Sequence, residues 1–189
     1  MSNAKRDSKV LLVMAHPALE KSRANSLLWK ASEGLEGVTR HDLYETFPDF
    51  VIDTPGEKKK LKEHDVIALQ FPFYWYAMPA LMKEWFDLVW LHGFAYGKGG
   101  DKLKGKKLFV ATTTGGPTSA YHKLGYNHFT MEEFLRPLEQ TADLCQMTWE
   151  TPFVVHGARI KDAAALEAES QRYRARLAGL VGEKAEVQS

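Results

Sequence analysis

The chain has 189 residues, a length that fits one domain with a substantial buried core. Apolar residues make up 44% and charged residues 26%, and 25 basic against 24 acidic side chains give a formal net charge of +1. Nucleic acids and anionic membranes both call for a basic face, so this balance argues against nucleic acid as a partner. The single cysteine, Cys145, excludes an internal disulfide, and its apolar surroundings predict a core residue.

Strands and helices alternate from the first residues onward. Lys9–Met14 is a nearly continuous apolar run, which is typical of a parallel strand covered on both faces. We expect a helix from Ser22 to about Gly34 and a short strand over Val38–Leu43. Asp53 is expected to cap a third element that carries Pro55 in its first turn.

The middle of the chain continues the same alternation. Asp65–Phe71 predicts a buried strand, and Lys107–Thr112 predicts another. Between them, Met78–Trp90 predicts an amphipathic helix whose apolar stripe contains Leu81, Trp85, Leu88 and Val89. No apolar run approaches the roughly 18–20 residues that a membrane-spanning helix needs, so we expect a cytoplasmic protein.

The last third predicts two helices around one strand. Thr130 and Glu133 form a capping box ahead of a helix over Met131–Leu144, and Pro137 is expected to kink that helix or delay its regular part. Phe153–His156 predicts a fifth strand. A final helix capped by Asp162 carries one apolar face, formed by Leu166, Tyr173, Leu177 and Leu180.

Five β–α units without repeats predict one doubly wound α/β domain over residues 9–181, with flexible termini at 1–8 and 182–189. Ligands of such domains lie outside the carboxyl ends of the strands. The segment after the first strand, Ala15–Asn25, ends at a helix N-terminus, which attracts anions. Ser22 and Asn25 can add donors there, and His16 and Arg23 can add charge; a plain N-cap by Ser22 is the alternative.

Two further segments follow strands. Four consecutive aromatic residues, Phe73 to Tyr76, suit a flat ring that needs a stacking wall; an aromatic plug under a loop or at a dimer contact is the alternative. Gly115 and Gly116 let the backbone approach a ligand closely, although such a pair is often only a turn.

The histidines show no pairing at metal-ligand spacing, so we expect no metal site. They are spread along the chain as His41, His64, His122 and His156, and His92 is interpreted as structural.

Together these segments resemble the NAD(P)H:quinone oxidoreductase family of the flavodoxin-like fold, most closely the short ancillary subunits of glutathione-gated Kef potassium-efflux systems. The resemblance runs from about Lys9 to Leu180. It implies a three-layer α/β sandwich with a five-stranded parallel sheet in the order 2-1-3-4-5 and helices on both faces. Its most specific parts are Ala15-His16-Pro17 with Ser22-x-x-Asn25, Phe71-Pro72-x-x-Trp75-Tyr76-x-x-Pro79-Ala80-Leu81-x-Lys83-x-Trp85, Gly93-Phe94-Ala95-Tyr96-Gly97, and Thr113-Thr114-Gly115-Gly116.

The resemblance assigns roles to these positions. The flavin phosphate or pyrophosphate would be held by His16, Ser22, Arg23, Ala24 and Asn25. The isoalloxazine ring would be held by Phe73, Tyr74, Trp75 and Tyr76, and its pyrimidine side by Thr113, Thr114, Gly115 and Gly116. Phe94 and Tyr96 would line the substrate pocket of a partner subunit in a homodimer. Tyr121 matches a catalytic tyrosine; Asn127 stands where the family has a histidine, and His128 beside it is the candidate replacement.

Two functions follow from this resemblance. The first is an NAD(P)H dehydrogenase that uses FMN, with FAD as the alternative, to pass a hydride to quinones or related electrophiles by a ping-pong mechanism. The second is a flavin-binding ancillary subunit of a potassium-efflux membrane protein, lying peripherally at the inner face of the membrane. A one-electron flavodoxin carrier is disfavoured, because flavodoxins have a different phosphate loop and are typically strongly acidic.

Overall fold

The structure is a computed structural model that describes residues 7–182. The expected flexible termini, 1–8 and 182–189, lie almost entirely outside this range. Ser8 is within it: the side chain is buried, and the backbone amide donates a hydrogen bond to the Val181 carbonyl at 2.9 Å. This hydrogen bond joins the segment before the first strand to the end of the last helix.

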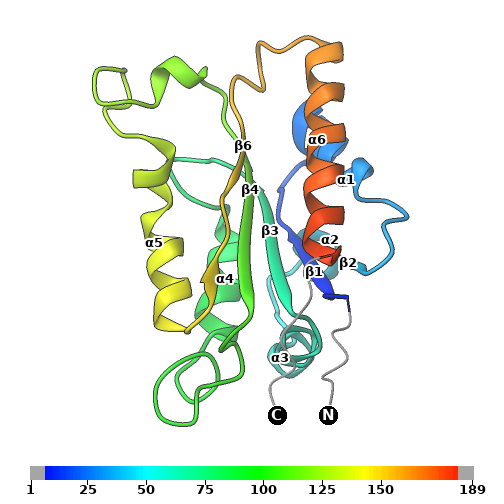
Figure 1. Ribbon diagram of the computed structural model, residues 1–189, viewed down its shortest axis with the longest axis vertical. Coiled ribbons are helices and arrows are strands. Elements are labelled where there is room, and N and C mark those ends of the chain that lie inside the picture. The colour runs from blue at the N-terminus through cyan, green and yellow to red at the C-terminus, as the bar shows by residue number, and fades with distance from the viewer. Residues whose placement is uncertain (1–6, 183–189) are drawn as a thin grey trace.

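A parallel sheet runs through the centre of the molecule (Figure 1). Its first four strands are β1 (Val10–Met14), β2 (Val38–Asp42), β3 (Val66–Pro72) and β4 (Lys107–Thr113). The order is β2-β1-β3-β4-β5, which confirms the predicted order 2-1-3-4-5. The fifth position is divided, because β5 (Thr148–Trp149) and β6 (Phe153–Val155) both pair with β4. Pro152 lies between them and has no N–H to donate to the ladder.

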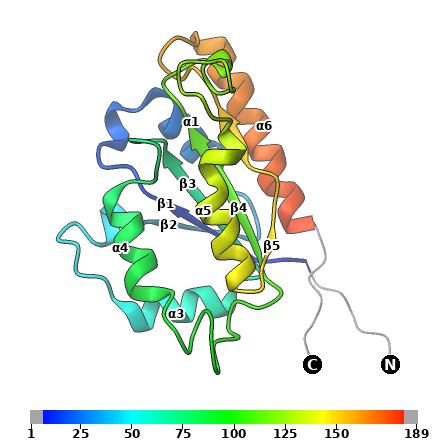
Figure 2. The same cartoon turned by 90° about the vertical axis from the view of Figure 1, so that its left-hand side faces the viewer.

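Helices cover both faces of the sheet (Figures 1 and 2). One face carries α1 (Arg23–Ala31) and α6 (Ala163–Gly182), and the other carries α3 (Thr54–Glu63), α4 (Ala80–Val89) and α5 (Met131–Leu144). Each face has its own apolar cluster, and β1 supplies both: Leu11 and Val13 point to the α3–α5 side, Val10 and Leu12 to the α1–α6 side. The shorter elements are η1 (Leu19–Lys21), α2 (Leu43–Thr46) and η2 (Thr118–Ala120).

Local expectations differ from the structure at a few places. The second strand ends at Asp42, not Leu43, because the Asp42 carboxylate accepts from the Tyr44 and Glu45 amides and starts α2. Leu88 was placed on the buried stripe of α4, but it is 38% exposed.

The start of α5 and the cysteine follow expectation more closely. The capping box of Thr130 and Glu133 is present, and α5 begins at Met131 without delay although Pro137 lies inside it. Cys145 is buried, and burial raises the pKa of its thiol to about 11, which confirms a core residue.

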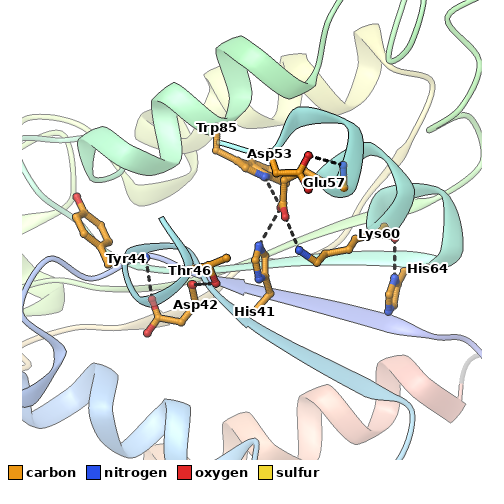
Figure 3. A network of polar contacts seen from close by, with 10 residues as sticks. His41, Asp42, Tyr44, Thr46, Asp53, Glu57, Lys60, His64 and Trp85 are labelled. Atoms are coloured by element: carbon orange, nitrogen blue, oxygen red, sulfur yellow. Dashed lines mark hydrogen bonds and ion pairs between the residues drawn. The ribbon is translucent and has the colours of Figure 1, made fainter. Parts of the chain in front are cut away.

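A buried carboxylate holds three elements of the α3–α5 face together (Figure 3). Glu57 of α3 is fully buried and accepts hydrogen bonds from His41 Nε2 at 2.9 Å and Trp85 Nε1 at 2.8 Å; Lys60 Nζ donates at 2.5 Å. Burial by itself raises the pKa of Glu57, but the bonds from His41 and Lys60 outweigh it, and the net shift is downward. The carboxylate thus ties β2, α3 and α4 to one another.

Candidate functional site

A cleft of about 520 Å³ lies at the carboxyl ends of β1, β3 and β4, where a doubly wound sheet places its ligand. All three predicted loops contribute to it. Its lining consists of His16, Ala18, Lys21, Ser22, Arg23, Ala24, Asn25, Pro72, Phe73, Tyr74, Thr113, Thr114, Gly115, Ala158 and Arg159. The fold therefore brings together ten of the thirteen residues expected to bind the cofactor.

The N-terminus of α1 forms one end of the cleft. Ser22 is its N-cap and accepts from the Asn25 amide at 3.1 Å, while the first-turn N–H groups have no partner within the helix. Lys21, Arg23 and Arg159 also line the cleft. Three cations around a helix N-terminus make this end suited to a phosphate.

His16 contributes a neutral donor to the same region. Its Nδ1 accepts from the Ala18 amide at 3.1 Å, so the ring proton is on Nε2. Burial lowers the pKa of His16, against the smaller opposing effect of Glu20. The lowered pKa favours the uncharged imidazole, whereas the sequence analysis had His16 adding charge; the role of His16 at the ligand stays a prediction. Its edge meets the Tyr74 ring at 5.9 Å between centroids.

Asn25 connects the first segment, which follows β1, to the third segment, which follows β4. Its Nδ2 donates to Thr113 Oγ1 at 2.8 Å, and both side chains are buried. Its Oδ1 is buried and has no hydrogen-bond partner among the described residues. A buried acceptor without a donor costs free energy, and a ligand hydroxyl would remove that cost. The tail of FMN is a ribityl phosphate, which carries hydroxyl groups and an anion together. The unpaired Asn25 acceptor and the nearby cations therefore fit a flavin of this kind.

The four aromatic residues after β3 divide into two groups. Phe73 and Tyr76 pack against Phe134 of α5, with ring centroids 5.5 and 5.2 Å away, so they partly serve as the aromatic plug considered from the sequence. Phe73 also lines the cleft, together with Tyr74, whereas Trp75 is outside the lining and 91% exposed. Trp75 and Tyr76 adopt φ values of +49° and +64°, a conformation unusual for these residues and common at binding sites.

The glycine pair leaves little room for side chains. A Cβ atom at Gly115 would lie 3.3 Å from Arg159 Nε, and one at Gly116 would lie 2.5 Å from the Tyr126 hydroxyl. The Thr114 hydroxyl donates to the Gly116 carbonyl at 2.8 Å, which holds the turn. Gly115 lines the cleft, while Gly116 lies behind its lining.

Neither residue of the expected catalytic pair, Tyr121 and His128, is part of the cleft lining. Tyr121 is half-buried, and burial raises its pKa. His128 is exposed and has a φ of +62°. The histidine beside Tyr121 is His156, which had been set aside: the ring centroids are 5.2 Å apart, and its Nδ1 lies 3.2 Å from Thr114 Oγ1. Asn127 is buried and accepts from the Tyr76 hydroxyl at 3.3 Å.

Phe94 and Tyr96 lie elsewhere in the chain's own fold. The Phe94 ring is buried in the α3–α5 core, and Tyr96 packs against that core with its ring edge-on to His92. Neither lines the cleft of its own chain. Their contact with a partner's pocket stays a prediction.

Sequence reasoning missed the segment after β6. Arg159 and Ala158 line the cleft, and His156 adjoins the third loop. The rule that ligands meet the carboxyl ends of strands could have singled out this segment, since it follows the predicted strand 153–156 directly. Across residues 7–182, no group of three or more acidic, histidine or cysteine side chains is arranged to hold a metal ion. Within the same range, no helix is both long and apolar enough to cross a membrane.

Comparison with known proteins gives one family over nearly the whole chain. Residues 8–177 match a family model described as flavodoxin-like fold. The glutathione-regulated potassium-efflux system ancillary protein KefG of Cronobacter sakazakii is 46% identical over 166 residues, which cover 88% of this chain and 90% of KefG.

Solved structures give the same fold. General stress protein 14 of Treponema denticola, in complex with FMN, has a TM-score of 0.86 and 35% identity over 91% of this chain and 99% of that one. An NADPH-quinone reductase of P. pentosaceus has a TM-score of 0.81 and 30% identity over 89% and 96%. A chain from a structure described as a thermophilic tryptophan halogenase from Streptomycin violaceusniger has a TM-score of 0.87 and 38% identity over 88% and 97%.

Proposed function

The chain belongs to the flavodoxin-like family, and from that premise we propose that it is an FMN-dependent NAD(P)H oxidoreductase that reduces quinones or related electrophiles. One observation carries the proposal: a single cleft joins the cationic N-terminus of α1 to the aromatic and glycine segments after β3 and β4. An anion-binding end and an aromatic wall in one cleft match a ring with a phosphate tail.

Each part of the cleft has a distinct task. Arg23, Lys21 and the first-turn amides of α1 neutralise the phosphate, and neutral His16 donates from Nε2. Tyr74 and Trp75 form the wall of the ring. A flavin bound here would supply the hydride chemistry between NAD(P)H and the acceptor. The protein holds both partners in position for that exchange.

The third loop is placed to meet developing negative charge. The Thr114 hydroxyl donates its proton to the Gly116 carbonyl. Thr114 Oγ1 is therefore the acceptor toward His156, whose Nδ1–H donates to it. The Tyr121 ring lies beside His156, with ring centroids 5.2 Å apart, so both rings adjoin this part of the third segment. Backbone N–H groups at Gly115 and Gly116 would stabilise charge on the pyrimidine side without reorganisation.

FMN is favoured over FAD. The cations sit at one place, around the α1 N-terminus, as a single phosphate requires. The Treponema denticola protein, 35% identical, is described in complex with FMN.

Steady-state kinetics test the activity. Protein reconstituted with FMN should oxidise NADPH when menadione is added, and initial rates at several fixed quinone concentrations should give parallel double-reciprocal lines. Protein that binds FMN but oxidises no NADPH or NADH with menadione contradicts the enzyme and leaves the flavin site standing.

A second function rests on a separate observation. Relatives at 46% identity over 88% of this chain are named as ancillary proteins of a potassium-efflux system. We therefore propose a regulatory role beside the reductase, in which this protein binds a membrane potassium-efflux protein. Addition of the purified chain to vesicles that contain such an efflux protein should raise the rate of potassium efflux, and an unchanged rate with no co-sedimentation contradicts this role.

A further inference from the structure

A column of polar side chains crosses the apolar layer between the sheet and the α1–α6 pair. The Tyr173 hydroxyl of α6 donates to Gln70 Oε1 of β3 at 3.1 Å, and Gln70 Nε2 donates to the Asn25 carbonyl of α1 at 3.0 Å. Asn25 Nδ2 continues the column to Thr113 Oγ1 of β4 at 2.8 Å. We call Tyr173, Gln70, Asn25 and Thr113 the polar column. Its three hydrogen bonds connect α6 to the cleft.

The inner half of the polar column has no contact with the cleft. Asn25 and Thr113 line the cleft, whereas Gln70 and Tyr173 do not, and both of these are fully buried. On the same face of β3, the preceding inward side chains are Val66 and Ala68. An aliphatic side chain would fill this layer without the cost of burying an amide and a phenol. Packing alone therefore does not account for the two polar residues.

The Asn25 carbonyl, which can only accept, decides which way the Gln70 amide faces, and Tyr173 holds the other end of that amide. Tyr173 is fully buried, and burial raises the pKa of its hydroxyl, so the phenol is protonated at neutral pH and can donate. With Tyr173 donating to Oε1, the Gln70 NH₂ faces the Asn25 carbonyl. The opposite orientation would place two carbonyl oxygens against each other. Tyr173 thus acts on α1 through Gln70.

We propose that Gln70 and Tyr173 are positioning residues for the phosphate end of the cleft. They hold the first turn of α1 at the Asn25 carbonyl and, through Asn25, hold Thr113, so that the helix amides are aimed before a ligand arrives. The inference rests on the proposed flavin site, but neither residue touches the ligand.

Two ligands separate positioning from general stability. Riboflavin has the ring and ribityl chain of FMN but no phosphate. Tyr173→Phe and Gln70→Met should each weaken FMN binding by about five- to tenfold, which is the loss of one aimed, charge-assisted contact, and riboflavin binding by at most about twofold. The double variant should bind FMN no more weakly than Gln70→Met alone, because Tyr173 acts through Gln70.

Thr112→Val is the matched control. The Thr112 hydroxyl is buried at the same end of β4 and donates to the Phe71 carbonyl at 2.9 Å, outside the polar column. This variant should leave the ratio of FMN to riboflavin affinity unchanged. Fluorescence titration of the apoproteins gives both affinities, and thermal melting shows that each variant is folded; if Gln70→Met does not fold, Tyr173→Phe decides alone.

Equal weakening of FMN and riboflavin, or unchanged FMN binding in a folded variant, overturns the positioning role and leaves the flavin site intact. Wild-type protein that binds neither ligand overturns the proposed function, and the positioning role with it.

Discussion

Single residues show where sequence reasoning succeeds and where it stops. Ser22, Asn25 and Gly115 could be assigned to the site because their types and their places after strands carry the signal, and all three line one cleft. The charge state of His16 could not be predicted, since it depends on burial and on the Ala18 amide that bonds its Nδ1. Nor could the place of His156 beside Tyr121 be predicted, because 34 residues, which form α5, β5, β6 and the loops around them, separate the two in sequence.

Replacement of an exposed aromatic residue tests the ring wall. Trp75 is 91% exposed, so Trp75→Ala should change the free energy of unfolding of the apoprotein by no more than about 0.5 kcal/mol. Loss of a stacking surface should nevertheless weaken FMN binding by about tenfold. Leu124→Ala, at a side chain that is 90% exposed, is the control and should leave FMN binding unaltered. FMN affinity equal to wild type in Trp75→Ala would place the ring elsewhere.

The pH dependence of flavin reduction tests His156. Burial lowers the pKa of this imidazole, so it gains a proton only as the pH falls below its ordinary value of 6.5. The proton would add positive charge next to Thr114, on the side where the proposed flavin ring would be negative when reduced. Stopped-flow reduction by NADPH should therefore accelerate as the pH falls through that pKa. His156→Gln should remove this inflection, and His122→Gln should retain it. An inflection that survives in His156→Gln excludes the role.

At the scale of elements, the long periodic segments and the apolar strands were predicted, whereas the α2 turn and the two-residue β5 were not. The helices at 131–144 and 163–182 follow from capping and from apolar faces that repeat over several turns. The α2 turn and the two-residue β5 carry no such pattern, because a tertiary contact decides each: Asp42 caps the first, and pairing with Lys107 and Leu108 makes the second. The same holds for Leu88, whose exposure depends on what packs against α4.

The buried carboxylate that joins β2, α3 and α4 gives a prediction about stability. Glu57→Gln should lower the free energy of unfolding at pH 7 by about 2 kcal/mol, since hydrogen bonds to a charged acceptor are replaced by weaker ones. The pKa of Glu57 is lower in the folded protein than its ordinary value of 4.5. Its ionised form therefore stabilises the fold above about pH 4.5, and this contribution is lost as the pH falls through the lowered pKa.

Urea denaturation at several pH values measures this difference. The gap between wild type and Glu57→Gln should be constant from pH 7 to about pH 5 and should narrow below it. Glu63→Gln, at an exposed residue of the same helix, should show almost no gap at any pH. A Glu57 gap that widens as the pH falls would mean that the carboxylate is protonated in the native state at neutral pH.

At the scale of the whole molecule, the doubly wound order brings together loops that are far apart in the sequence. Residues 16–25, 73–74, 113–115 and 158–159 meet because four strands end at one edge of the sheet. The alternation of elements predicted a doubly wound domain, and the resemblance supplied the sheet order. The segment after β6 could have been singled out by its place after a predicted strand, whereas the different contacts of the four aromatic residues required the packed structure.

Association of two chains is a separate prediction at this scale. The resemblance places Tyr96 in the pocket of a partner subunit, and Tyr96 lies outside the cleft of its own chain. Sedimentation equilibrium should therefore give twice the chain mass of 21.4 kDa. Tyr96→Ala should raise KM for menadione while FMN affinity is retained. A monomeric protein with full quinone reductase activity would refute the shared pocket.

The central claim is that separate loops at the carboxyl ends of the strands bind one flavin. Hydrogen–deuterium exchange with and without FMN tests this claim most directly. Saturating FMN should slow amide exchange jointly at the start of α1, in the segment 73–77 and in the segment 113–116. The segments 37–39 and 62–64, which lie at the opposite end of the strands, should exchange as before. Protection confined to one of these loops, or located at the opposite end of the strands, would contradict the account.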